Sequence, residues 1–252
     1  MFDITTLVQI SDCHLFASRS GQHFHANVYE NLYKVLSHIK LYSNADLIIF
    51  TGDLSQDHSL NSYQLFVNAF IENGINIPVY FLAGNHDEQQ LLQENLSVAP
   101  FIKQDIIELS QWQLLLVDSK SDTPSGEVKP QQLQAFQKQI NPEKAQLLFM
   151  HHHPVDVGYF IDKHGLLNKD VMMAFIEKNH SVAGMACGHV HQGLTYPLML
   201  EGRNINLYTC PATSIQFDSD SEQGKVTKQG AGYRIFTLDN NKQLTTEVIY
   251  LS

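Results

Sequence analysis

The sequence has few cysteines, no long apolar run and no basic leader. Its three cysteines (Cys13, Cys187 and Cys210) show no CxxC spacing, and their odd number argues against a disulfide framework or a thiolate-held zinc site. No apolar run approaches the ~18 residues that a membrane-spanning helix needs, so an integral membrane protein is excluded. The first residues carry an acid where an export signal would carry basic residues. A reducing cytoplasm is therefore the expected location.

Basic residues are scarce as well. The chain of 252 residues has 16 Lys and Arg against 26 Asp and Glu, which gives a formal net charge of −10. A surface of this sign repels the backbone of nucleic acids, so polymeric DNA or RNA is not expected as a substrate. No internal repeat and no linker rich in Pro, Gly or Ser divides the chain. Residues 1–252 are therefore predicted to form a single domain.

The first half of the chain alternates short apolar runs with longer amphipathic segments. The runs predict strands at residues 7–10, 47–50 and 79–82, and the amphipathic segments predict helices at 28–41 and 63–71. Strands joined by helical connections of this length pair in parallel through right-handed crossovers. Their carboxyl ends then meet at one edge of the sheet, where α/β proteins bind ligands.

The second half predicts a change in sheet type. Two runs at 106–109 and 114–117 are close enough for an antiparallel hairpin. Pro130 begins a helical pattern that extends to Ile140, and Asn168 is placed to cap a second helix that ends near Asn179. Further strands are predicted at residues 146–150, 182–187, 194–200, 205–210, 233–238 and 244–251.

Asp, Asn and His residues follow five of these predicted strands. Taken singly, each is more commonly a turn cap, an Asx turn or a hydrogen-bonded histidine than a ligand. Five such events at one sheet edge are difficult to reconcile with that reading, because a crowd of acids and imidazoles is costly unless a cation neutralises it. The residues concerned are Asp12 and His14, then Asp53, then Asn85, His86 and Asp87, then His151, His152 and His153, and finally His189 and His191.

These blocks resemble, in order, the signature of the calcineurin-like metallophosphoesterases: DxH, GD, GNHD, a His, and GHxH. A narrower resemblance is to the bacterial class III cyclic-AMP phosphodiesterases. It rests on residues 9–12, 14–16, 51–57, 151–154, 187–192, 216–217 and 244–248. The resemblance implies an α/β metallophosphoesterase fold, a four-layer αββα sandwich of two mixed sheets.

The resemblance also implies a role for each residue. It makes Asp12, His14, Asp53 and His191 the ligands of one metal, and Asp53, Asn85, His151 and His189 the ligands of a second, so that Asp53 bridges the two. His86 would meet the phosphate and protonate the departing oxygen. The residues expected to contact substrate are His14, Asp53, Asn85, His86 and His191. The roles of His152 and His153 stay open.

Oxygen and imidazole ligands suit manganese, iron, cobalt or zinc, and the resemblance favours iron or manganese. It implies hydrolysis of 3′,5′-cyclic AMP to 5′-AMP by a hydroxide that bridges the two metals, in a monomer or homodimer. The alternatives are a metallophosphoesterase for another phosphodiester or phosphomonoester, such as a glycerophosphodiester or a nucleotide derivative, and a non-catalytic scaffold. A scaffold would be expected to lack ligands, whereas this chain has a candidate for each.

Two polar loops, at residues 156–165 and 214–231, are predicted to wall the substrate cleft on either side. The first includes His164, which either belongs to a structural loop or faces the nucleotide. One departure from the family pattern is Cys13, where a small hydroxyl residue is usual. Its place between Asp12 and His14 predicts that it faces away from the metals.

Overall fold

The computed structural model describes residues 4–221 and 224–251. The first of its two large sheets has the strand order β14-β13-β1-β4-β5-β6. The four strands from the first half of the chain pair in parallel, and the two C-terminal strands add antiparallel at one edge. Their bounds are β1 Thr5–Ile10, β4 Leu47–Phe50, β5 Val79–Phe81, β6 Phe101–Ile102, β13 Gly232–Leu238 and β14 Leu244–Tyr250.

The second sheet has the order β11-β12-β10-β9-β8-β7 and is also mixed. Its four central strands are parallel, and each edge strand is antiparallel to its neighbour. The predicted hairpin is confirmed as the edge pair of β7 and β8. The bounds are β7 Ile106–Glu108, β8 Trp112–Val117, β9 Ala145–Met150, β10 Val182–Cys187, β11 Thr195–Leu200 and β12 Arg203–Thr209.

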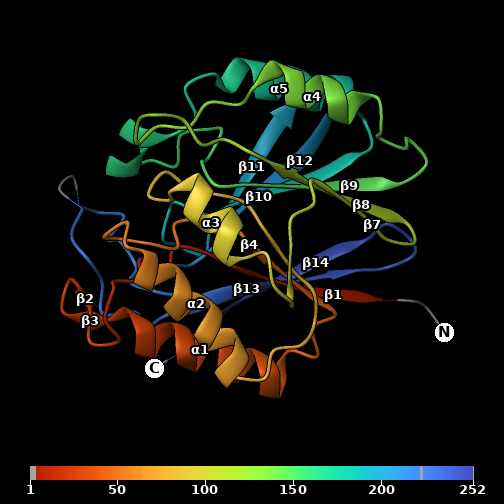
Figure 1. Cartoon of the computed structure of the whole chain (residues 1–252). Coiled ribbons are helices and arrows are strands. Elements are labelled where there is room, and N and C mark those ends of the chain that lie inside the picture. Colours follow the sequence, from red (N-terminus) through yellow and green to blue (C-terminus); the bar gives the residue numbers. More distant parts are fainter. Residues whose placement is uncertain (1–3, 222–223, 252) are drawn as a thin grey trace.

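Four helices cover the outer faces of the sheets. On the first sheet lie α1 (Val28–Tyr42) and α2 (Leu60–Glu72), and on the second lie α4 (Pro130–Gln137) and α5 (Lys169–Lys178). Figure 1 shows the resulting layers, with helices below the lower sheet and above the upper one. Buried apolar side chains join each helix pair to its sheet, and a third cluster fills the space between the sheets. The predicted αββα sandwich is confirmed.

Local details differ from the predictions in two places. The helix that begins at Pro130 ends at Gln137, three residues before Ile140. Asn168 precedes α5 as predicted, but its side chain makes no capping hydrogen bond. Its amide instead accepts from the backbone nitrogen of Val128 at 3.0 Å and donates to the carbonyl of Val128 at 2.8 Å. The side chain of Asn168 therefore makes a tertiary contact instead of the helix-capping hydrogen bond that the local sequence pattern predicts.

Several short elements were not predicted. They are a two-stranded hairpin of β2 (Gln22–His23) and β3 (Ala26–Asn27), the helix α3 (Gln89–Asn95), the strand β6 and the 3₁₀ helix η1 (Phe160–His164). Each is too short to display a hydrophobic period. In the parts of the chain that the structure describes, no helix is both long and apolar enough to cross a membrane. The assignment of residues 1–252 to one domain stays a prediction.

The buried guanidinium of Arg234 links the two sheets. Arg234 lies on β13 of the first sheet and is 2% exposed. It donates hydrogen bonds to the carbonyls of Thr209 on β12 (3.0 Å) and of Leu194 (2.8 Å), and to the hydroxyl of Thr246 (3.1 Å). Because a buried cation needs polar partners, these carbonyls hold the edges of the two sheets in a fixed relation beside the polar cluster described next.

Candidate metal centre

The structure brings together all seven side chains that were predicted as ligands. Each follows a strand of one of the two sheets: β1, β4 and β5 of the first, and β9 and β10 of the second. The carboxyl ends of these strands meet where the sheets face each other. Of the seven, only Asn85 is half-buried, and the others are buried: Asp12, His14, Asp53, His151, His189 and His191.

The first group of donor atoms belongs to Asp12, His14, Asp53 and His191. The Nε2 atoms of His14 and His191 lie 3.2 Å apart. Asp12 Oδ1 lies 3.3 Å from Nε2 of His191 and 4.0 Å from Nε2 of His14. Asp53 Oδ2 lies 3.7 Å from Nε2 of His14. Ligands held about 2.0–2.2 Å from one cation stand roughly 3.0–3.4 Å from each other, so this group fits a divalent metal ion.

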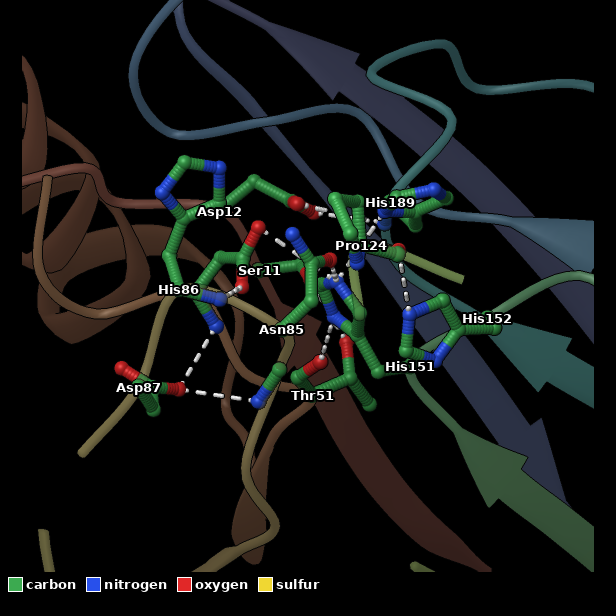
Figure 2. Close-up of polar contacts among 12 residues, drawn as sticks. Ser11, Asp12, Thr51, Asn85, His86, Asp87, Pro124, His151, His152 and His189 are labelled. Atoms are coloured by element: carbon green, nitrogen blue, oxygen red, sulfur yellow. Dashed lines mark hydrogen bonds and ion pairs between the residues drawn. The ribbon is translucent and has the colours of Figure 1, made fainter. Parts of the chain in front are cut away.

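The second group centres on Nε2 of His151. This atom lies 3.1 Å from Oδ1 of Asn85, 3.2 Å from Nδ1 of His189 and 3.4 Å from Oδ2 of Asp53. Figure 2 shows Asn85, His151 and His189 directed toward one another. Asp53 Oδ2 is within 3.7 Å of both groups, so its carboxylate is placed to bridge two cations. The assignment of these seven residues as ligands is carried forward as a proposal.

Five of these residues have a backbone conformation that L-amino acids rarely adopt. The φ angles of Asp12, His14, Asp53, His189 and His191 are 56°, 47°, 57°, 66° and 54°. A left-handed conformation outside glycine costs of order 1–3 kcal/mol per residue, and such strain gathers at functional sites. These residues lie in the loops that follow β1, β4 and β10, and no pattern in the sequence had indicated their backbone conformation.

In three of the candidate ligand histidines, a hydrogen bond from the ring nitrogen Nδ1 orients the ring. Nδ1 of His151 donates to the carbonyl of Thr51 at 2.7 Å, and Nδ1 of His191 donates to the carbonyl of Ile215 at 2.8 Å. Nδ1 of His14 donates to Oε1 of Gln56 at 2.8 Å. With the proton fixed on Nδ1, the lone pair of Nε2 faces the cluster, as metal ligation requires. Gln56 was not among the predicted site residues, although it lies in the block 51–57.

The other two histidines of the triplet have partners away from the cluster. His152 pairs Nδ1 with the hydroxyl of Ser119 (2.9 Å) and Nε2 with the carbonyl of Pro124 (3.2 Å; Figure 2). Nε2 of His153 pairs with Oδ1 of Asp162 at 3.2 Å. Both ring nitrogens of His152 are therefore occupied by protein groups, although this ring lies close enough to His151 and His189 to be considered a ligand. The geometry favours His151 over its neighbours.

Asp87 is a buried carboxylate that supports Asp53. It accepts hydrogen bonds of 2.9 Å each from the backbone nitrogens of Asp53, Leu54 and Gly84. The loops after β4 and β5 are thereby joined. Burial and the neighbouring Asp53 raise the pKa of Asp87 to about 7, against the effect of these N–H donors. Gly84 is required at this junction, since a Cβ there would lie 2.2 Å from Oδ1 of Asp53.

We predict that Asp87→Ala weakens metal binding and lowers the melting temperature. The change leaves three buried N–H groups without an acceptor, each at a cost of about 1–3 kcal/mol, and it releases the loop that carries Asp53. Calorimetric unfolding and metal titration measure the two effects. Asp87→Asn, which keeps one acceptor oxygen, should be milder. An alanine variant that matches the original protein in both measurements would contradict this role.

The buried imidazoles make the protein sensitive to acid. Burial lowers the pKa of His14 to about 3 and that of His153 to about 4, and it lowers the pKa of His152 and His189 well below their usual range. Burial also opposes charge on His151, but the adjacent Asp53 raises its pKa to about 9. The majority of these rings are therefore neutral in the folded state at pH 7.

We predict that the metal-free protein loses stability as the pH falls from about 6.5 to about 4. In the unfolded chain these histidines titrate near 6.5, so over this interval the unfolded state binds more protons than the folded state. Lower pH therefore favours unfolding, with His14 and His153 among the groups responsible. Melting temperatures in chelator across this pH range measure the effect. A constant melting temperature would contradict it.

A cavity of about 320 Å³ opens onto the cluster. Both predicted wall loops reach it, although residues 222 and 223 of the second loop lie outside the described residues. The loops meet each other, because the rings of Phe160 and Phe217 lie 5.0 Å apart, and Phe217 stacks on His191 at 4.3 Å. Apart from candidate ligands, the cavity is lined by His23, Gln56, His86, Pro124, Ile161, His164 and Phe217.

His86 lines this cavity but belongs to neither group of four candidate ligands. Its backbone nitrogen donates to Oδ1 of Asp53 at 2.8 Å, which fixes the start of the side chain, and its ring lies 5.0 Å from that of His14. The side chain is half-buried and lines the cavity. It is therefore placed to reach a bound molecule.

Cys13 is buried outside both groups of candidate ligands, as predicted.

Known proteins resemble this chain in fold or in sequence. A dimetal phosphatase from Danio rerio has a similar fold, with a TM-score of 0.67 at 12% identity over 98% of this chain and 99% of its own. A probable cyclic nucleotide phosphodiesterase from Colwellia psychrerythraea is 49% identical over 98% of this chain and 95% of its own length. The 3′,5′-cyclic adenosine monophosphate phosphodiesterase CpdA of Escherichia coli is 33% identical over 96% and 88%.

The family model for calcineurin-like phosphoesterases matches residues 5–193, which include every candidate ligand from Asp12 to His191. The matched region covers most of the chain and includes the strand ends of both sheets that carry the candidate ligands. The chain therefore belongs to the calcineurin-like phosphoesterase family and is a hydrolase of phosphoric esters.

Proposed function

We propose that this protein hydrolyses 3′,5′-cyclic AMP to 5′-AMP in the cytoplasm. The observation that carries the proposal is the convergence of seven ligand-type side chains at a cavity of about 320 Å³, in a chain that is 49% identical to a probable cyclic nucleotide phosphodiesterase. The named activity of the Escherichia coli relative, 33% identical along 96% of this chain, supports cyclic AMP as the substrate.

The two groups of side chains would hold two divalent cations, with Asp53 shared. Iron or manganese is the proposed pair, and zinc or cobalt would suit the same donors. When bound, two such cations neutralise phosphate charge and lower the pKa of water toward neutrality. The hydrogen bonds from His14 to Gln56, from His151 to Thr51 and from His191 to Ile215 hold the donor atoms in place before substrate arrives.

His86 is the proposed general acid. Hydrolysis of a 3′,5′-cyclic nucleotide to the 5′-monophosphate breaks the bond between phosphorus and O3′, and the departing alkoxide needs a proton. The side chain of His86 lines the cavity. Its backbone bond to Asp53 places the ring at the edge of the cluster. His86 therefore supplies a proton at O3′, while His14, Asp53, Asn85 and His191 surround the phosphoryl group.

A substrate comparison tests the proposal. The purified protein, reconstituted with manganese or iron, is assayed against cyclic AMP, cyclic GMP and bis(p-nitrophenyl) phosphate, with products identified by chromatography. We expect 5′-AMP from cyclic AMP and only modest discrimination against cyclic GMP, since a dinuclear centre recognises mainly the phosphate. If bis(p-nitrophenyl) phosphate is cleaved rapidly while cyclic AMP is untouched, the substrate assignment fails. The same preparation can be sized to separate a monomer from a homodimer.

A further inference from the structure

The β2–β3 hairpin holds an unusual turn beside the cavity. Gln22 pairs with Asn27 and His23 with Ala26, so that Phe24 and His25 form a two-residue turn. Both turn residues have positive φ, 47° and 67°. Hairpins with this turn prefer Asn-Gly, and each bulky residue forced into the left-handed region costs about 1–2 kcal/mol. Strain of this kind is retained where a precise backbone serves a site.

The residue that this turn positions is His23. Its ring centroid lies 5.2 Å from that of His14, and its side chain lines the same cavity as His86. An imidazole carries at least one N–H donor whether it is neutral or protonated. His23 therefore presents a donor next to the first group of candidate ligands.

No described protein group accepts a hydrogen bond from this ring. In the stretches 4–221 and 224–251, the side chain of His23 makes no hydrogen bond, and its Nδ1 is buried without a partner. The neighbouring His14 and His191 differ, because each has one ring nitrogen bonded to Gln56 Oε1 or to a backbone carbonyl. Nδ1 of His23 is shielded from solvent, so Nε2 is the atom that an occupant of the cavity can reach.

A metal ion is not the missing partner. Among the groups of described Asp, His, Glu and Cys residues whose donor atoms lie close enough to share a cation, none includes His23. Cations held by the candidate ligands would make this place attractive to an anion. A phosphoryl group bound to such cations would bring its oxygens into the cavity that both His23 and His86 line. An N–H donor suits such an oxygen.

We propose that His23 is a substrate-binding residue whose Nε2–H donates to a non-bridging phosphoryl oxygen, and that the β2–β3 hairpin places it there. This inference rests on the proposed hydrolysis of phosphoric esters but does not require cyclic AMP. It also separates two histidines of the cavity. His86 protonates the leaving oxygen, whereas His23 contacts an oxygen that stays on phosphorus, so its contribution is independent of the leaving group.

The test replaces His23 with Leu, which removes the donor at similar volume. A charge-assisted hydrogen bond corresponds to about a 10- to 100-fold effect. We therefore expect His23→Leu to weaken the binding of inorganic phosphate to the metal-loaded protein by at least tenfold in calorimetry. We also expect kcat/KM to fall about 10- to 100-fold on bis(p-nitrophenyl) phosphate and on cyclic AMP alike. Elemental analysis should still find two metals per chain.

Two further variants sharpen the result. His23→Gln restores an N–H donor and should recover part of the phosphate affinity. His180→Leu alters an exposed histidine away from the cavity and should change neither phosphate binding nor kcat/KM. His23→Met serves as a second donor-free variant should the leucine variant not fold.

The inference would be overturned if a folded donor-free variant kept the phosphate affinity and the kcat/KM of the original protein. It would also be overturned if that variant lost one of the two metals. The outcome is separable from the proposed function. If cyclic AMP is not hydrolysed, phosphate binding and bis(p-nitrophenyl) phosphate still report on His23. If cyclic AMP is hydrolysed equally by His23→Leu, the role of His23 fails and the substrate proposal stands.

Discussion

Asp53→Asn is expected to abolish phosphodiester hydrolysis and the stabilisation that metal provides. Oδ2 of Asp53 lies 3.7 Å from Nε2 of His14 and 3.4 Å from Nε2 of His151, so a single carboxylate serves both groups of donors. An amide has one acceptor oxygen and no charge, so it cannot neutralise and join two cations. Turnover should fall below detection.

Metal-dependent stability provides an independent measurement of the same substitution. A ligand at 100 times its Kd that binds only the folded state stabilises it by about 2.7 kcal/mol. Added manganese should therefore raise the melting temperature of the original protein and have a much smaller effect on Asp53→Asn. Asp170→Asn, an exposed carboxylate in the first turn of α5, is the matched control and should behave like the original protein. Full activity of metal-stripped Asp53→Asn would end the two-metal proposal.

His86→Ala is expected to retain two metals and to lose on the order of 10² to 10⁴ in the rate of cyclic AMP hydrolysis. The imidazole of His86 lines the cavity, while the two groups of donor atoms are complete without it. The loss should shrink with bis(p-nitrophenyl) phosphate, because p-nitrophenolate departs without a proton and a ribose alkoxide does not. Comparison of kcat on the two substrates, with metal content measured alongside, tests this assignment.

The leaving-group comparison also distinguishes His86 from His23. Loss at His86 should depend on the leaving group, and loss at His23 should not. Equal losses on both substrates for His86→Ala would assign that ring to phosphate binding instead of proton donation. His180→Ala, on an exposed ring between α5 and β10, is the control for a histidine without a role at the cavity.

Much of this architecture could be predicted because the informative patterns are local. Apolar runs with a helical or strand period identified β1, α1, β4 and α2, and their order implied parallel pairing. The polar blocks follow strands directly, and strand ends of parallel sheets converge for topological reasons. The four candidate ligands that follow β1, β4 and β5 could therefore be placed at one edge of the first sheet before any contact was known. The three that follow β9 and β10 lie on the second sheet, which only the family resemblance implied.

The tertiary structure alone decided the features that depend on contacts between distant segments. Asn168 bonds Val128 instead of capping its own helix, since two chain segments that meet in space offer a better partner than the helix end. His152 is excluded from the second donor group by Ser119 and Pro124, which lie about thirty residues away in sequence. A run of three identical histidines does not indicate which ring will contact the metal site and which will bond to other protein groups.

By itself, then, the sequence determined the order of the elements and the polar blocks that hold the candidate ligands, because each is encoded in a short periodic run or in a block beside one. The sandwich and the choice of ligands within these blocks were implied by the resemblance to a known family. The tertiary structure decided the strained φ angles at Asp12 and Asp53, the fixed tautomer of His151 and the place of His23 in the cavity. These three features depend on packing and hydrogen bonds between distant segments, which a local sequence pattern does not predict. The hairpin that carries His23 has only two residues in each strand, so its conformation depends on tertiary packing more than on local propensity.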